Sequence, residues 1–164
     1  LQVDERFTVG AAPTLNKLAA SHLPAVATVV VALGTATTYD CITAEGVFLG
    51  GIIAPGLRTS ADTLIRRTSK LPATELVPPP RAIGTRTEDC IRAGVLFGAA
   101  DAIDGLVRRI KGEWPTKRVP RIVATGGLAP LVTAICREID LVEPHLTLYG
   151  LQIAFDFLEQ GDTA

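Results

Sequence analysis

The sequence predicts an α/β fold in which a mixed sheet starts with antiparallel strands and carries helices on its flanks. Three β-rich runs, at residues 26–33, 37–43 and 47–53, follow one another too closely for helical crossovers, so they must form an antiparallel meander. Helical patterns then alternate with one further strand, at residues 121–124. The 164 residues, 48% of them hydrophobic, suffice for one core, so we expect a single domain over residues 1–164.

The first elements each have a local cause. Pro13 can open a short helix that runs to about Ser21, because the first turn of a helix does not need the missing N–H. The run Val26–Leu33 is β-branched and almost continuously apolar, as in a strand covered on both faces. Gly34 ends this strand, and Glu45-Gly46 supplies the turn before the third one.

Two helices are expected between the meander and the last strand. Apolar residues recur at helical spacing from Leu57 to Ile65, and a linker with four prolines follows at residues 71–84. The pattern Thr85-x-x-Glu88 is typical of a capping box, and the apolar spacing after it predicts a long helix over residues 85–111. Glycine costs about 1 kcal/mol relative to alanine inside a helix. Three glycines there indicate that another element, such as a partner helix, packs close to the backbone: Gly94, Gly98 and Gly105.

The C-terminal third is expected to return to the sheet and to end in helices. After the strand at residues 121–124, Thr125-Gly126-Gly127 forms a tight turn. A helix should follow over residues 128–139, with Pro130 in its first turn, and a last amphipathic helix over residues 148–158.

Composition argues against several kinds of partner. Sixteen Lys and Arg against 17 Asp and Glu leave a net charge of −1, which provides no electrostatic footprint for nucleic acid or for an anionic membrane. No apolar run approaches the roughly 20 residues that span a bilayer. Cys41, Cys90 and Cys136 are far apart and odd in number, which fits a reducing compartment, so we expect a cytoplasmic protein.

Two glycine motifs each have two interpretations. The Gly34-Thr35-Ala36-Thr37-Thr38 stretch can present N–H groups and hydroxyls to phosphate oxygens, or it can be a hairpin turn with β-prone threonines. The Gly126-Gly127 turn can expose its backbone to a nucleotide, or it can need glycine for geometry alone. Residue patterns by themselves leave both pairs of alternatives open.

Five segments taken together resemble one family. In chain order they read ALGTATTYD, GVFLGGIIAPGLRTSADTLIRRTSKLP, IGTRTEDCIRAGVLFG, IVATGGLAPLV and LTLYGL. From about Val9 to about Leu158 the chain is similar to the C-terminal half of type III pantothenate kinases, also called the Bvg accessory factor family. The resemblance implies the C-terminal lobe of the actin-like, Hsp70-like and sugar-kinase-like ATPase fold (ribonuclease H-like). It also implies that the N-terminal lobe, with the first phosphate loop, lies outside these 164 residues.

The same resemblance implies an activity and its requirements. The family phosphorylates pantothenate with ATP to 4'-phosphopantothenate, the first step of coenzyme A synthesis, and uses Mg²⁺ and a monovalent cation, K⁺ or NH₄⁺. It also forms homodimers, for which we expect the helix over residues 85–111. Residues matching the family's ATP contacts are Gly34, Thr35, Thr37, Gly126 and Gly127, and those matching its substrate contacts are Gly10 and Thr87.

Three positions depart from the family pattern. Ala12 stands where the family carries its catalytic Asp, Pro13 where it carries a substrate-binding Arg, and Ala32 where an Asp ligates the monovalent cation. Phosphoryl transfer depends on positioning and on charge neutralisation, and the loss of a general base alone costs about 10²- to 10⁴-fold in rate. Asp40 remains, and we expect its role to be mainly structural.

Two functional hypotheses follow from these observations. In the first, the chain is the C-terminal lobe of a type III pantothenate kinase, inactive when isolated. In the second, it is a non-catalytic relic or accessory module that keeps the fold and dimerises. A different ATPase or sugar kinase of the same superfold is disfavoured, because the segments after GTATT are more specific than the loops common to the superfold.

Overall fold

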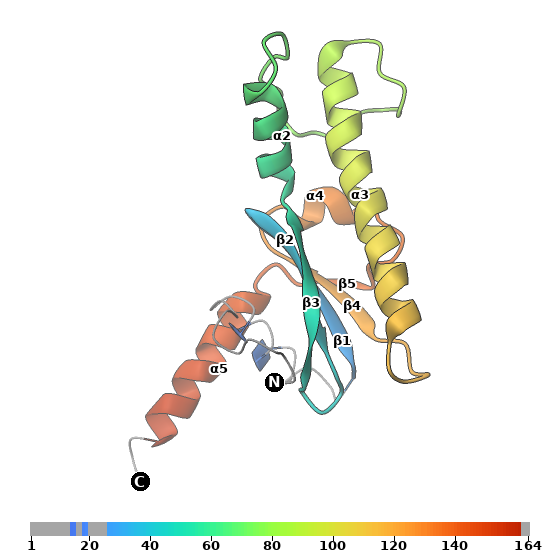
Figure 1. Cartoon of the computed structure of the whole chain (residues 1–164). Coiled ribbons are helices and arrows are strands. Elements are labelled where there is room, and N and C mark those ends of the chain that lie inside the picture. Colours follow the sequence, from blue (N-terminus) through green and yellow to red (C-terminus); the bar gives the residue numbers. More distant parts are fainter. Residues whose placement is uncertain (1–13, 16–17, 20–25, 162–164) are drawn as a thin grey trace.

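The computed structural model describes residues 14–15, 18–19 and 26–161, and within them a five-stranded mixed sheet with helices on both faces (Figure 1). The strands are β1 (Thr28–Leu33), β2 (Ala36–Ile42), β3 (Phe48–Pro55), β4 (Arg121–Thr125) and β5 (Leu141–Val142). The helices are α2 (Leu57–Arg66), α3 (Thr87–Glu113), α4 (Ala129–Thr133) and α5 (Leu146–Gly161). Across the sheet the order is β3-β2-β1-β4-β5. The first three strands are antiparallel, and β4 and β5 run parallel to β1, as the α/β prediction requires.

Side-chain alternation gives the sheet two different faces. On one face Val29, Val31 and Leu33 of β1 form a large core with α2, α3 and α4. On the other, Val30 packs in a smaller cluster that includes Leu146 of α5. The strand β1 is therefore apolar on both sides, as its unbroken hydrophobic run predicts.

Most expected elements are confirmed within a few residues, and two expectations are wrong. The helix expected over residues 128–139 ends at Thr133, because the Asp104 carboxylate on α3 accepts the backbone N–H groups of Arg137 and Glu138 and draws that segment away from a helical path. The segment after Glu138 then forms β5, which was not predicted because the strand is only two residues long.

The capping box at the start of the long helix is also wrong. Helix α3 begins at Thr87, two residues after Thr85, and its N-cap is Arg86, which makes no side-chain capping hydrogen bond. The Thr85 hydroxyl instead accepts a hydrogen bond from the Arg81 guanidinium at 3.5 Å. The preceding Gly84 packs on the first turn of α3, where a Cβ would lie 2.7 Å from the Cys90 backbone nitrogen. The glycines of α3 meet nothing among the described residues: a Cβ at Gly94, Gly98 or Gly105 would find open space.

Some expectations fall partly or wholly outside the described residues. Of the helix expected from Pro13 to Ser21, the described residues at 14–15 and 18–19 are helical. Gly10, Ala12 and Pro13 lie outside the described residues. Within the described part, none of the helices combines the length and the apolar character needed to cross a bilayer.

Candidate functional site

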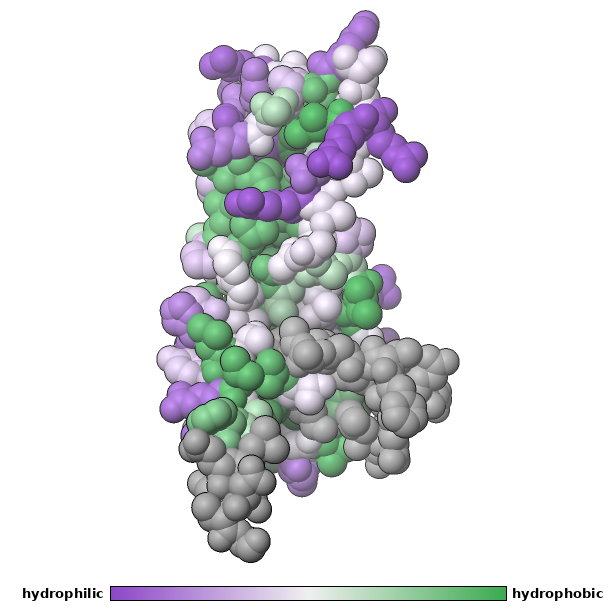
Figure 2. All heavy atoms as spheres, turned by 90° about the vertical axis from the view of Figure 1, so that its left-hand side faces the viewer, coloured by the Kyte–Doolittle hydropathy of each residue, from purple (hydrophilic) through white to green (hydrophobic). Residues whose placement is uncertain are grey.

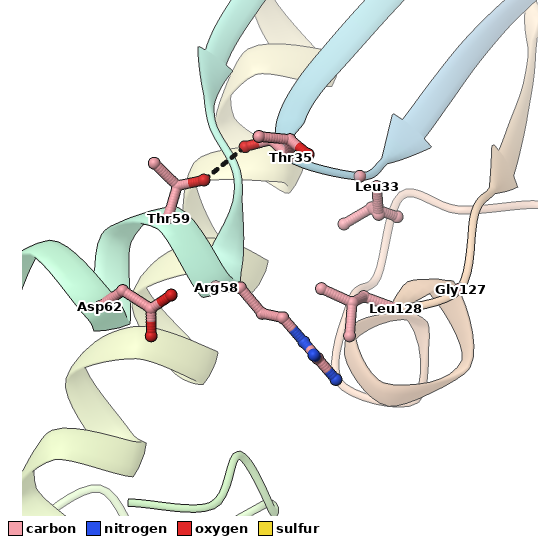
Figure 3. Close-up of a pocket in the computed structure, with 8 residues that line it drawn as sticks. Leu33, Thr35, Arg58, Thr59, Asp62, Gly127 and Leu128 are labelled. Atoms are coloured by element: carbon pink, nitrogen blue, oxygen red, sulfur yellow. Dashed lines mark hydrogen bonds between the residues drawn. The ribbon is translucent and has the colours of Figure 1, made fainter. Parts of the chain in front are cut away.

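A pocket of about 440 Å³ opens where the β1–β2 loop, the start of α2 and the turn before α4 meet (Figure 3). It joins segments that are far apart in sequence but share one end of the sheet. Its lining residues are Leu33, Gly34, Thr35, Arg58, Thr59, Asp62, Gly127 and Leu128. Both glycine motifs singled out in the sequence thus contribute to one cavity.

The β1–β2 loop is held by the start of α2. The Thr35 carbonyl accepts hydrogen bonds from the Gly56 backbone N–H at 3.1 Å and from the Thr59 hydroxyl at 2.7 Å. A Cβ at Gly56 would clash with the carbonyl oxygens of Gly34 and Thr35, so glycine is needed there for close approach. Gly34 itself does not adopt positive φ. The loop is therefore a hairpin connection whose carbonyls face α2 and whose exposed side, including the Thr35 side chain, faces the pocket.

The turn before α4 depends on Gly126. This residue has φ of +98°, and a Cβ would lie 2.6 Å from the Leu33 carbonyl oxygen. Both the backbone conformation and the steric clash therefore exclude a side chain at this position. The close approach places Gly127 and Leu128 beside the end of β1. A Cβ at Gly127 would meet nothing within 4 Å, so this glycine is not required by packing and its backbone faces open space.

The pocket chemistry suits an anion at one end. Helix α2 starts at the pocket with Gly56 as its N-cap, without a side-chain cap and without an acidic residue in its first turn. Free N–H groups and the helix dipole attract negative charge there. Arg58 adds a guanidinium that extends toward the turn before α4, while Asp62 lies one helical turn further along (Figure 3). Arg58, Thr59 and Asp62 were not predicted as site residues, although their position directly after the Pro55-Gly56 break was a usable signal.

Three expected site residues among those described do not line this pocket: Thr37, Thr87 and Gly126, the last of which shapes the turn beside it. Thr37 is buried on the α3-facing side of β2, where it pairs with Leu33 and Ala54. Thr87 is exposed at the first position of α3, beside Glu88 and Asp89 of the same turn, which lower the attraction of that helix end for an anion.

Ala32 lies on the opposite face of the sheet from the main core. Its cross-strand partners are Thr38 on β2 and Thr125 on β4, so the three side chains form one row. Thr125 is 1% exposed, and its hydroxyl finds no hydrogen-bond partner in the described structure. A methyl group at position 32 supplies neither a charge nor an acceptor to this row. Asp40, on the same face, is buried.

The described residues contain no group of three or more His, Cys, Asp or Glu side chains placed to hold a metal ion. Burial raises the pKa of Cys41 to about 11 and that of Cys136 to about 12. Both thiols therefore stay protonated near neutral pH and cannot serve as thiolate nucleophiles. The chemistry of the pocket must come from hydroxyls, backbone groups, one guanidinium and one carboxylate.

Comparison with known proteins identifies a family. The family model for type III pantothenate kinase matches residues 1–109. The chain is 46% identical over 154 residues to the type III pantothenate kinase of Desulfatibacillum aliphaticivorans, covering 93% of this chain and 59% of that protein. It is 46% identical over 159 residues to that of Roseiflexus castenholzii, covering 97% and 62%. The chain thus spans about 60% of the length of the curated relatives it matches.

Solved structures show the same fold at low identity. A conserved putative Baf family transcriptional activator from Campylobacter jejuni matches with a TM-score of 0.58 at 20% identity, covering 92% of this chain and 65% of that one. The activator of the 2-hydroxyisocaproyl-CoA dehydratase from Clostridium difficile matches with a TM-score of 0.55 at 14% identity, covering 94% and 69%. The expected actin-like ATPase fold is confirmed. The family match over residues 1–109 and the identities near 45% establish that the chain belongs to the type III pantothenate kinase family.

Proposed function

We propose that this chain is the nucleotide-contacting lobe of a type III pantothenate kinase, which uses ATP to phosphorylate pantothenate to 4'-phosphopantothenate. The observation that carries the proposal is that the Gly34-Thr35 loop and the Gly127 turn, which match the family's ATP contacts, line one pocket. Family membership supplies the reaction.

In this proposal the ATP phosphates lie against the β1–β2 loop and the start of α2. The Thr35 hydroxyl and the first N–H groups of α2 donate to phosphate oxygens, and the Arg58 guanidinium neutralises part of their charge. Leu33 and Leu128 offer apolar contact to the rest of the nucleotide. Gly126 acts through the backbone geometry of the turn, and Thr37 through the packing of β2.

The isolated chain should not catalyse the reaction. Ala12 cannot accept the pantothenate hydroxyl proton, and Pro13 cannot bind the substrate through charge. In the family, Mg²⁺ and K⁺ or NH₄⁺ neutralise phosphate charge. The residues present do not fit these cations, because the pocket has Asp62 as its one carboxylate and position 32 is an alanine. A non-catalytic module that keeps the fold remains the alternative function.

We also propose a homodimer through α3, with pantothenate bound near Thr87. Gly94 and Gly98 are exposed and leave space for another helix to approach. The sequence predicts such close packing, and the described part of the chain does not supply it. Ile83, 82% exposed just before α3, extends the same region. In this arrangement the Asp89 carboxylate is already paired with Arg92 of the same helix at 3.1 Å. The Glu88 carboxylate lies 4.0 Å from the Arg86 guanidinium.

The test is a calorimetric titration of the 164-residue chain with ATP, together with two pocket variants. We expect weak binding, because part of the cleft lies outside the chain. Gly127→Val should abolish binding, since it fills open pocket space without a clash, and Thr35→Ala should weaken it several-fold by removing one donor.

Gly112→Val is the matched control, because a Cβ at Gly112 also meets open space but lies near the end of α3, away from the pocket. Equal ATP binding by wild type, Gly127→Val and Gly112→Val would place the nucleotide elsewhere. Incubation of the chain with pantothenate, MgATP and K⁺ should form no phosphopantothenate above background. Turnover at about 1 s⁻¹ or faster, typical of kinases, would overturn the proposal that the isolated chain is inactive.

A further inference from the structure

A second cavity, of about 270 Å³, lies between the edge strand β3 and the C-terminal end of α3. It is near the β2–β3 hairpin, at the end of the sheet away from the Thr35 pocket (Figure 1). The lining residues that matter here are Cys41, Gly50, Ile52, Ile110, Glu113 and Trp114. This cavity is on the α3 side of the sheet, whereas the apolar surface in the lower part of Figure 2 lies at α5, on the other side.

The backbone of β3 keeps this cavity open. Gly50 pairs with Cys41, beside an irregularity in the pairing of β2 with β3. Its φ of +130° disfavours any side chain, and a Cβ there would meet nothing within 4 Å. At the next position, a Cβ on Gly51 would clash with the Tyr39 carbonyl oxygen. Two successive positions of the edge strand therefore carry no side chain, and the space beside the end of α3 stays unfilled.

The walls of the cavity suit a flat apolar group of limited size. Ile110 is buried, and Ile52 and Trp114 are partly buried side chains that pack on the main core. An indole ring offers apolar contact to another ring, and its face also attracts cations. Pockets for drug-sized ligands have volumes of about 300–1,000 Å³. A cavity below that range accommodates a smaller molecule, such as one ring with a short chain.

The one charged residue that lines the cavity is acidic. Glu113 is exposed, and in the described part of the chain its carboxylate forms no ion pair or hydrogen bond. The cations that are near it in sequence do not line the cavity: Arg109, Lys111, Lys117 and Arg118. Lys111 is held by Glu138 at 2.7 Å. The Glu113 carboxylate is therefore available to a ligand.

The rest of the lining adds to this negative charge. The last carbonyl groups of α3, which ends at Glu113, lack donors from a following turn and carry negative partial charge. Burial, together with the nearby Asp40 and Glu113 carboxylates, raises the pKa of the Cys41 thiol to about 11. The thiol is thus neutral near pH 7, and the Glu113 charge acts on the floor of the cavity.

We propose that this cavity binds a small organic ammonium ion, an amine carried on a single flat ring, with the amine at Glu113 and the ring against Trp114. The ammonium group donates hydrogen bonds to the Glu113 carboxylate and lies in the negative field of the α3 end. The ring removes apolar surface of Ile52 and Trp114 from water. A neutral ring compound of the same size gains only the apolar contact, and an anion is repelled.

The experiment titrates the 164-residue chain with 2-phenylethylamine and, separately, with the neutral 2-phenylethanol and the anionic phenylacetate. No nucleotide is added. Trp114 is the one tryptophan of the chain, so its fluorescence reports on this cavity directly. We expect a saturable change with the amine at millimolar concentrations. The amine should bind about fivefold more tightly than the alcohol, which is the effect of one partly exposed ion pair, and phenylacetate should bind most weakly.

Glu113→Gln should lower the affinity for the amine to that for the alcohol and leave the affinity for the alcohol unchanged. Glu88→Gln is the matched control, because it makes the same change at the other end of α3 and should alter neither affinity. Equal affinities of wild type for the amine and the alcohol would overturn the proposal. So would an unchanged amine affinity in Glu113→Gln, or a fluorescence response to the amine that does not saturate.

Discussion

Replacing Asp104 by alanine should be among the most destabilising single changes outside the apolar core. Asp104 is 5% exposed on α3, and its two carboxylate oxygens accept the Arg137 N–H at 3.0 and 2.9 Å and the Glu138 N–H at 3.0 Å. Hydrogen bonds to a charged group contribute about 1.5–3 kcal/mol each, so two donors set an upper range of about 3–6 kcal/mol. Removing the carboxylate also removes the cost of burying it, which brings the expected loss to about 3 kcal/mol.

The assay is urea unfolding followed by Trp114 fluorescence and circular dichroism. Asp104→Asn keeps the shape and one acceptor oxygen, so it should cost about 1–2 kcal/mol, less than alanine. Asp101→Ala is the control, because Asp101 is exposed on the same helix. Amide exchange at Arg137 and Glu138 should also accelerate at least tenfold in the alanine variant. A loss within 0.5 kcal/mol of Asp101→Ala would refute the assigned role of the carboxylate.

Three further predictions concern single residues. Gly126→Ala should destabilise the protein by about 2 kcal/mol or more, because the φ of +98° disfavours any side chain and a Cβ would clash with the Leu33 carbonyl oxygen. Gly127→Ala is its control and should change the free energy of unfolding by less than about 0.5 kcal/mol. Thr125→Val should stabilise by about 1 kcal/mol in urea unfolding by removing a buried hydroxyl without a partner, and a loss would show that the hydroxyl binds something. A hydrogen bond from Lys111 lowers the pKa of Glu138 below its ordinary value of 4.5. Wild type should therefore be more stable than Glu138→Gln above pH 4.5, and this difference in the free energy of unfolding should decrease as the pH falls through the lowered pKa. A difference that does not change with pH would contradict this.

The strands could be predicted because their cause is local. An apolar β-branched run and a Glu45-Gly46 turn, where Gly46 has φ of +75°, specify the meander without help from distant residues. The length of α4 could not be predicted in this way. Its end is set by Asp104, which is about 30 residues away in sequence, and no helical spacing reveals that a distant carboxylate will take two backbone N–H groups. The missing Thr85 cap is different, because it accompanies a local contact between Gly84 and Cys90, six residues apart.

The candidate site was predictable only in part. The motif residues Gly34, Thr35 and Gly127 line the pocket, whereas Arg58 belongs to a helix whose register against the β1–β2 loop is a tertiary property. The threonine at position 37 shows the limit of motif reading. It belongs to the same short stretch as Thr35, yet strand alternation turns its side chain into the core.

The glycines in the pocket lining and those beside it differ in what they indicate about function. Gly126 and Gly56 are demanded by the fold itself, since any side chain at either position would clash with the β1–β2 region, so a chain without catalytic activity would need them equally. Gly127 and the Thr35 side chain are not demanded by the fold, because one faces open space and the other is exposed. Nucleotide binding is therefore tested by the second pair. If Thr35→Ala and Gly127→Val both leave ATP affinity unchanged, the glycine motifs serve the architecture of the lobe and the accessory-module hypothesis gains its main support.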